Sequence, residues 1–406
     1  MKTVLLDNGL TLALVHFPGS TAGFDFCANY GPAFEGKKEA GIGHFLEHVF
    51  LSGSRKYGRK KPFSLVEGRG GELNAFTSME ETHFYSRVRC ADFSLPAKIF
   101  GACFNDFSFK EKHVATEKKI ILNEIKEVKD HPVKRLFDEF WEIALPKPFN
   151  RSILGTEKTV SKITPAMLER CLKKNYFSQN CVFGIATSLP EKKILGEIGS
   201  AFSFRAGRTK KIKAKAGWRK ARERESIAKT EQAHCCLGFP VMPANSEPYF
   251  AMTLIDCYLG GGISSKLMQE IREKRGLSYQ VATYLDVEKA HGVFAVYFST
   301  KPEKVNEAKK LVLKEFERLQ SKKLGSQVLS KLKNQVIGSK SLELENSYNN
   351  ARLAVECLLY GWGSPEQFIE KIKAVSAEEI KQVARDFLQT EEYAFAKLLP
   401  EKSASK

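Results

Sequence analysis

Apolar and polar residues alternate near the start of the chain, in residues 3–6 and again in residues 10–16. The segment between them, Asp7-Asn8-Gly9, contains the Asn-Gly pair that is typical of a tight hairpin turn. The pattern therefore predicts two paired strands at this end of the chain rather than an export signal, which favours the cytoplasm as the location. No apolar run reaches the roughly 18 residues that a membrane-spanning helix needs, so no membrane span is expected.

Two other segments have apolar residues at helical spacing, residues 39–52 and residues 115–130. The first contains Gly41 and Gly43, which weaken the start of a helix. The second is rich in strong helix formers and holds several glutamates. Glu117 and Glu124 are seven positions apart, so a helix places them on the same face.

The order of elements repeats weakly along the chain. Leu51-Ser-Gly-Ser54 resembles Leu259-Gly-Gly-Gly262, which lies 208 positions later, and each follows an apolar helical stretch. Strand-like segments come next, at residues 71–85 in the first half and at residues 276–284 and 292–298 in the second. We therefore predict an α+β fold with two similar domains, each an antiparallel sheet covered by helices. The expected domains are residues 1–205 and 225–406, joined by a linker at 206–224.

Charge is concentrated around this linker. The whole chain has a net charge of +17, and residues 205–224 contain ten lysines and arginines against a single acid, Glu223. Such a run can bind nucleic acid, but the only interleaved aromatic residue is Trp218. A solvated linker is the favoured interpretation, and no nucleic-acid partner is predicted.

The nine cysteines are scattered and form no C-x-x-C pair. Reduced, mostly buried thiols are expected, which again suits the cytosol.

The first predicted helix contains two histidines four residues apart, in Gly41-Ile-Gly-His-Phe-Leu-Glu-His48. Helical geometry points His44, Glu47 and His48 in one direction. Two imidazoles at this spacing can bind one metal ion, and the intervening carboxylate can act as a general base on a water beside it. The pattern H-x-x-E-H is the inverted form of the H-E-x-x-H metalloprotease helix. A helix with two histidines on a polar face is the competing interpretation.

A catalytic zinc needs a third protein ligand. Glu117 and Glu124 in the second helix are candidates, and Asn123 and Glu127 lie to the side of them. A glutamate on a helix is more often a solvated surface residue, so spacing alone does not select the ligand.

The motif and its surroundings resemble the zinc metallopeptidase family of pitrilysin, insulin-degrading enzyme and the mitochondrial processing peptidase, the inverzincins. The resemblance includes the glutamate 76 residues after His48, and it extends over nearly the whole chain. The other matching segments are residues 70–77, 148–159, 260–267 and 272–279. The length of the chain resembles the single-unit, processing-peptidase-like branch found in bacteria.

The resemblance implies one zinc ion per chain, bound by His44, His48 and Glu124. It implies Glu47 as the general base, and Glu117 as a second acid near the metal that does not bind it.

The second half does not repeat the metal set, because the offset of 208 places Met252, Ile255 and Asp256 at its three positions. The resemblance implies that this half is an inactive substrate clamp, with Arg272 and Tyr279 reaching the catalytic half to bind a substrate carbonyl and the oxyanion. Without the resemblance, both would be read as ordinary surface or strand residues.

The resemblance further implies that Asn74 and Ala75 lie on an exposed edge strand that binds an extended peptide. The expected function is therefore a zinc endopeptidase that cleaves unstructured peptides inside a closed chamber, of which each chain forms one half of a clamshell. A homodimer is expected, with a heterodimer containing an inactive homologue as the alternative. The competing function is a non-catalytic scaffold or partner subunit in a larger peptidase assembly.

Overall fold

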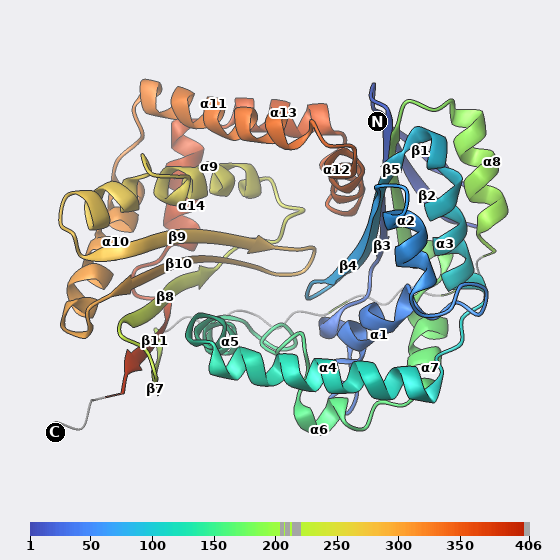
Figure 1. The fold of residues 1–406 in the computed structure, drawn as a ribbon. Helices are drawn as coiled ribbons and strands as arrows, with labels where there is room; N and C mark the ends of the chain where they lie inside the picture. Colours follow the sequence, from blue (N-terminus) through green and yellow to red (C-terminus); the bar gives the residue numbers. More distant parts are fainter. Residues whose placement is uncertain (204–206, 208–211, 213–220, 402–406) are drawn as a thin grey trace. The chain divides into compact units, whose positions relative to one another are not determined.

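The computed structural model describes residues 1–203, 207, 212 and 221–401, which divide into two compact units. The first unit contains residues 1–125, 152–212 and 341–365, and the second contains residues 126–151, 213–340 and 366–406. Each unit has one β-sheet with helices on it, as drawn in Figure 1, so the predicted α+β class is confirmed. In the described residues no helix combines the length and the apolar character needed to cross a membrane.

The sheet of the first unit has the strand order β1-β2-β6-β3-β5-β4. The strands are β1 (Lys2–Leu5), β2 (Thr11–His16), β3 (Thr21–Ala28), β4 (Glu72–Thr77), β5 (Thr82–Arg89) and β6 (Cys181–Thr187). The β1–β2 hairpin has the predicted antiparallel pairing, and Gly9 in its turn has the positive φ of 82° that glycine tolerates. The sheet is antiparallel apart from β2 and β6, which pair in parallel.

Helices of the first unit flank this sheet. They are α1 (Ile42–Phe50), α2 (Lys61–Glu67), α3 (Ser94–Asn105), α4 (Glu111–Asp130), α6 (Glu157–Val160), α7 (Pro165–Asn175), α8 (Glu191–Ala201) and α12 (Ser347–Leu359), with the short turns η1 (Pro32–Phe34), η2 (Cys90–Asp92) and η3 (Ser178–Asn180). The last five residues of α4 belong to the second unit. Phe24 and Phe26 of β3 point into the main core of this unit, together with Phe45 and Phe50 of α1. Figure 1 shows α12 on the opposite face of the sheet.

The second unit has a sheet of order β7-β11-β8-β10-β9. Its strands are β7 (Arg222–Ala228), β8 (Ala233–Pro240), β9 (Ser278–Val287), β10 (Gly292–Thr300) and β11 (Ala394–Pro400). Its helices are α5 (Pro132–Ala144), α9 (Pro248–Gly260), η4 (Met268–Glu273), η5 (Pro302–Lys304), α10 (Val305–Ser321), α11 (Ser326–Glu343), α13 (Pro365–Ala374) and α14 (Ala377–Phe387). This sheet is also antiparallel except for one pair, β7 with β11.

The two units exchange one helix each, which differs from the expected division at residue 205. Helix α12 comes from the second half of the chain but packs on β3, β6 and β2 of the first sheet. Helix α5 comes from the first half but packs on β11, β8 and β7 of the second sheet. Apolar periodicity identifies which face of a helix is buried, but it does not identify the sheet that covers the face. The units are therefore assembled from interleaved segments.

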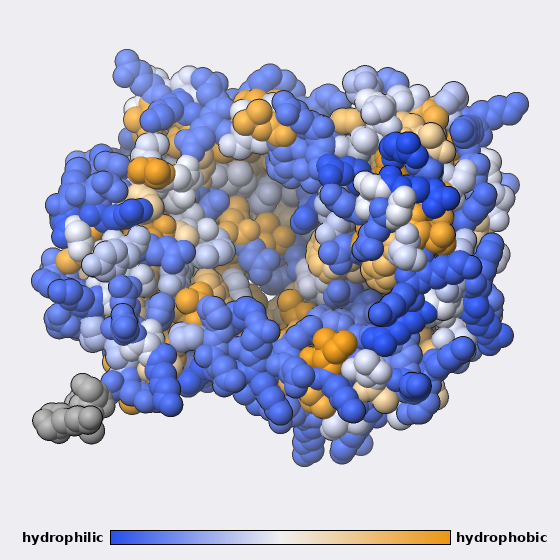
Figure 2. Space-filling view, viewed as in Figure 1, coloured by the Kyte–Doolittle hydropathy of each residue, from blue (hydrophilic) through white to orange (hydrophobic). Residues whose placement is uncertain are grey.

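The expected linker at 206–224 lies mostly outside the described residues. Its last part is described, and residues 222–224 form the start of β7 rather than a linker. All nine cysteines are free thiols, and eight of them are buried. Figure 2 shows hydrophilic residues over most of the visible face, with apolar residues in smaller groups, as expected when the large apolar side chains fill the cores.

Candidate metal centre

Helix α1 presents a polar edge next to a buried apolar face. Phe45, Leu46 and Val49 are fully buried in the core, which leaves His44, Glu47 and His48 on the remaining side. The helix begins at Ile42, three residues later than predicted, because Gly41 has the left-handed φ of 90° that ends the preceding turn. The core packing thus fixes the direction of all three polar side chains.

A buried carboxylate holds the first turn of α1. The two Glu35 oxygens accept hydrogen bonds from the backbone N–H groups of Gly41 at 2.8 Å and Gly43 at 2.7 Å. The first N–H groups of a helix have no hydrogen-bond partner within the helix. The positive end of the helix dipole also lies there and stabilises a nearby carboxylate. Glu35 therefore caps the N-terminus of the helix that contains His44 and His48.

His44, His48 and Glu124 converge in the first unit. The Glu124 Oε2 atom lies 3.8 Å from His44 Nε2 and 3.7 Å from His48 Nε2, and the two imidazole centroids are 4.6 Å apart. One ligand atom from each residue lies within 4.8 Å of the others. Two ligands of one tetrahedral zinc, with bonds of 2.0–2.2 Å, are about 3.4 Å apart. The donor set and its spacing therefore fit a zinc ion.

Burial keeps His44 in the form that binds a metal. Burial and, to a smaller extent, the neighbouring His48 together lower the pKa of His44 to about 3. The ring is therefore neutral near pH 7 and has a lone pair available, as a metal ligand requires.

Glu117 contacts His48 from the side away from Glu124. Its Oε2 lies 3.5 Å from His48 Nδ1, while Arg59 Nη2 donates to its Oε1 at 2.6 Å and His113 Nε2 lies 3.3 Å from the same atom. A carboxylate on the second nitrogen of a metal-binding histidine fixes the tautomer and orientation of the ring. The geometry gives Glu117 this orienting position rather than a place among the three converging ligand atoms.

Arg59 and His113 were not identified from the sequence. His113 precedes Glu117 by four residues on α4, so helical spacing could have paired them. Arg59 lies in a basic loop before α2, and no spacing rule connects it to α4.

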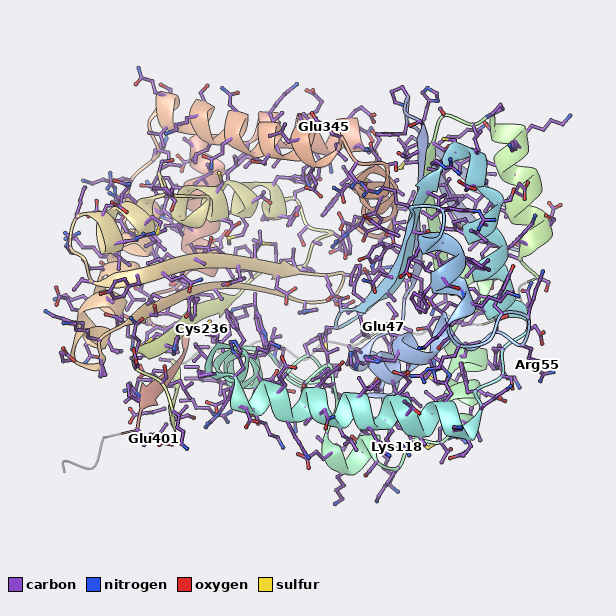
Figure 3. The ribbon with its side chains drawn as sticks, viewed as in Figure 1. Glu47, Arg55, Lys118, Cys236, Glu345 and Glu401 are labelled. Atoms are coloured by element: carbon purple, nitrogen blue, oxygen red, sulfur yellow. The ribbon has the colours of Figure 1, made fainter. Side chains whose placement is uncertain are left out.

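Glu47 lies beside the end of β4. The Thr77 hydroxyl donates to Glu47 Oε2 at 2.7 Å. Burial raises the pKa of Glu47 above its ordinary value, whereas the Thr77 hydrogen bond and His48 lower it and Glu124 raises it. Figure 3 labels Glu47 near α1 and Lys118 on α4. The ammonium group of Lys118 donates to the carbonyl of Ser161. Thr77 belongs to the 70–77 segment, but its contact with Glu47 was not predicted.

Asn74 and Ala75 lie on β4, the outermost strand of its sheet. Asn74 is exposed and Ala75 half-buried, and β4 pairs only with β5 among the described strands. The predicted position on an edge strand therefore agrees with the fold of this unit.

Arg272 and Tyr279 belong to the second unit. Arg272 lies in η4, with Nε 3.7 Å from a Glu273 carboxylate oxygen, and Tyr279 lies in β9 with 74% of its surface exposed. Of the predicted site residues, the first unit thus brings together His44, Glu47, His48, Glu117 and Glu124, and the second unit holds Arg272 and Tyr279.

Helix α9 of the second unit holds the positions equivalent to those of α1. Met252 and Ile255 are fully buried there, and burial raises the pKa of the Asp256 carboxyl. The side chains at these positions provide no metal set.

Comparison with known proteins agrees with this geometry. Residues 12–157 match the family model "Insulinase (Peptidase family M16)", and residues 162–336 match "Peptidase M16 inactive domain". An uncharacterized zinc protease of Streptomyces coelicolor is 30% identical over 404 residues, covering 96% of this chain and 87% of the relative.

Two solved structures share the fold. A protease from Helicobacter pylori superposes with a TM-score of 0.91 at 18% identity, over 98% of this chain and 99% of the other. A protein from Pseudomonas fluorescens described as a peptidase M16 inactive domain superposes with a TM-score of 0.90 at 19% identity, over 100% of this chain and 99% of the other. On the family models and the relative together, this chain belongs to peptidase family M16, the insulinase family of zinc proteases.

Proposed function

We propose that the protein is a zinc-dependent endopeptidase that cleaves unstructured peptides or short polypeptides. The observation that carries this proposal is the convergence of His44, His48 and Glu124, with Glu47 one helical turn from His44 on the same helix. These three residues would hold a single zinc ion per chain.

When bound, the zinc would make its water a stronger nucleophile and polarise the scissile carbonyl. Glu47 would accept a proton from the attacking water and deliver it to the leaving amine. Thr77 would hold the Glu47 carboxylate in place for both transfers. Glu117, anchored by Arg59 and His113, would keep the His48 ring in one orientation.

An extended peptide would bind along β4 as an additional strand, at Asn74 and Ala75. Main-chain hydrogen bonds would supply most of this recognition, so it would depend on a free extended segment more than on side chains. We further propose that Arg272 binds a substrate carbonyl and that Tyr279 donates to the developing oxyanion. The second unit would therefore clamp the substrate without holding a metal.

The proposal extends to the assembly and its location. By resemblance to single-chain relatives of about twice this length, two copies would pair as a homodimer with two sites. A heterodimer with an inactive homologue is the alternative. The free and mostly buried thiols suit a reducing compartment such as the cytoplasm.

The decisive experiment is the Glu47→Gln variant. Loss of the general base should lower kcat for an unstructured peptide by about 10²–10⁴-fold, while bound zinc stays at the wild-type level. Glu67→Gln, an exposed glutamate at the end of α2, is the matched control and should keep full activity. Unchanged peptidase activity in zinc-loaded Glu47→Gln would contradict the assignment of the base.

The ligand set is tested separately by Glu124→Ala, which should lose the zinc ion that His44, His48 and Glu124 would hold. Full zinc occupancy in that variant would instead implicate Glu117 or Glu127. A wild-type protein that binds zinc but cleaves no member of a mixed library of unstructured peptides would favour the non-catalytic alternative, a scaffold or partner subunit.

A further inference from the structure

A second cluster of potential metal ligands lies on the other face of the first sheet. Successive residues of a strand point to opposite faces, so Asp25 and Cys27 of β3 share the face that α12 covers. His83 of β5 lies directly opposite Cys27 in the strand register, and Glu81 precedes it by two residues. None of these four residues is more than 3% exposed. Four ionisable groups therefore occupy a position where an apolar core is expected.

The cluster is centred on His83. Its Nδ1 lies 3.0 Å from both oxygens of Asp25, and its Nε2 lies 3.3 Å from Glu81 Oε2. One ligand atom each from Cys27, Glu81 and His83 lies within 4.8 Å of the others.

A metal-free network is the first explanation to consider. In it, a protonated His83 would bridge the two carboxylates. Hydrogen bonds between charged nitrogen and oxygen are usually about 2.7–2.9 Å long, and the contact to Glu81 is longer. The separation of 3.3 Å instead agrees with the roughly 3.4 Å between two ligands of one tetrahedral zinc.

Glu81 supplies an independent observation. Its Oε1 is buried and has no hydrogen-bond partner among the described residues, although Tyr360 donates to its Oε2 at 3.2 Å. An unpaired oxygen of a buried carboxylate is costly, because it has given up its bonds to water without gaining a partner in the protein. A cation bound at this point would satisfy it.

We propose that Cys27, Glu81 and His83 bind a second divalent cation of the zinc class, with Asp25 orienting His83. Sulfur, imidazole and carboxylate together are the donors that zinc prefers. Asp25 fits the usual partner of a metal-binding imidazole, since both its oxygens face Nδ1 and would direct Nε2 to the metal. The ion would join β3 to the start of β5 beneath α12.

Metal binding must displace the proton of the thiol. Burial raises the pKa of Cys27 to about 12 when no cation is present, so the thiol is neutral near pH 7. Coordination would release this proton to solvent, as it does for other zinc-bound cysteines. The metal–sulfur bond replaces the S–H bond, and a protonated His83 likewise releases its Nε2 proton to solvent as the metal–nitrogen bond forms. The Glu81 oxygen binds the ion through a lone pair, and no redox partner is needed.

The first test is the zinc content of the full chain, with any affinity tag removed, after loading with Zn²⁺ and desalting. We expect about two zinc ions per wild-type chain and about one in each of Cys27→Ser and Glu124→Ala. The control Cys103→Ser changes another fully buried thiol of the same unit, which donates to the Leu51 carbonyl and lies outside both proposed ligand sets, and it should keep both ions. A wild-type content of one ion that Cys27→Ser leaves unchanged would refute the second site.

Cobalt substitution distinguishes the two sites without any activity measurement. The set His44, His48 and Glu124 contains no sulfur, so a thiolate-to-cobalt charge-transfer band can arise only elsewhere. The band should appear in wild type, Glu124→Ala and Cys103→Ser, and disappear in Cys27→Ser.

The cobalt spectrum also covers the case in which Cys27→Ser fails to fold. Absence of the band from cobalt-loaded wild type would overturn the proposal with no variant at all, and so would its persistence in Cys27→Ser. A band that remains in Glu124→Ala would support this site even if the proposed peptidase function proved wrong.

Discussion

At the scale of single residues, the Thr77 hydroxyl stabilises the ionised form of Glu47 through a hydrogen bond. Burial raises the pKa of Glu47, and the hydrogen bond from Thr77 is the largest influence that lowers it. A general base acts only in its ionised form, so any change that raises this pKa moves the onset of activity to higher pH.

Thr77→Val should therefore shift the acidic limb of the kcat/KM profile upward. Loss of a hydrogen bond worth about 1.4 kcal/mol to the ionised form raises a pKa by about one unit. The measurement is the pH dependence of peptide hydrolysis at constant zinc. Thr77→Ser keeps the hydroxyl and should restore the wild-type profile. An acidic limb that does not move in Thr77→Val would show that the hydroxyl does not govern Glu47.

The sequence predicted the residues of the metal centre that lie together on α1. It predicted fewer of the residues that come from other elements and reach the centre only when the chain folds. The shared direction of the His44, Glu47 and His48 side chains follows from their spacing and helical geometry alone. Glu124 could be preferred over Glu117 only through the family resemblance, because both lie on the same face of α4. The cluster of Cys27 and His83 was missed, since their proximity depends on the pairing of β3 with β5, which no local pattern specifies.

At the scale of elements, α1 depends on a cap that comes from outside the helix. Glu35 is 6% exposed and accepts from two N–H groups at the start of α1. Its removal leaves these two buried donors unpaired next to the turn that carries His44. The position of His44 and His48 thus depends on Glu35, a residue that is not itself one of the proposed metal ligands or catalytic groups.

Glu35→Ala should lower the free energy of unfolding by about 2 kcal/mol and weaken zinc binding. Glu39→Ala removes a partly exposed glutamate close to the same helix and should change stability by less than about 0.5 kcal/mol. Urea unfolding and zinc titration of both variants provide the comparison. Equal stability of the two variants would contradict the capping role of Glu35.

At the scale of the whole molecule, the proposed homodimer rests on the resemblance to single-chain relatives of about twice this length, and on the presence of both the metal set and the Arg272 and Tyr279 pair in this chain. The net charge of +17 makes copies repel one another at low salt, so the assembly should be measured at physiological ionic strength. Multi-angle light scattering at assay concentration should give twice the chain mass of 45.6 kDa. A monomeric mass under conditions in which the protein is active would refute the dimer.

The exchange of α5 and α12 between the units was the part of the fold that the sequence could not predict. The two α+β halves follow from the repeated order of helices and strands. The exchange depends on close contacts between backbones, which periodicity does not record. Gly23 and Gly184 make this contact possible on the first sheet, because a Cβ at either position would lie 2.2 Å from the backbone of α12.

Gly184→Ala therefore tests whether α12 belongs to the first unit. The added methyl would meet the Ala351 carbonyl oxygen at 2.2 Å and push α12 from the sheet, at an expected cost of about 1–3 kcal/mol. Gly196→Ala is the matched control, since nothing lies within 4 Å of its Cβ position on α8, and better helix propensity should stabilise it by about 0.5–1 kcal/mol. Urea unfolding measures both changes, and limited proteolysis at the ends of α12 detects its release. If α12 packed elsewhere, the methyl group of Gly184→Ala would meet no backbone, and this variant would not be destabilised relative to Gly196→Ala. A loss of stability in Gly184→Ala together with a gain in Gly196→Ala would therefore support the packing of α12, a segment from the second half of the chain, on the sheet of the unit that carries His44 and His48.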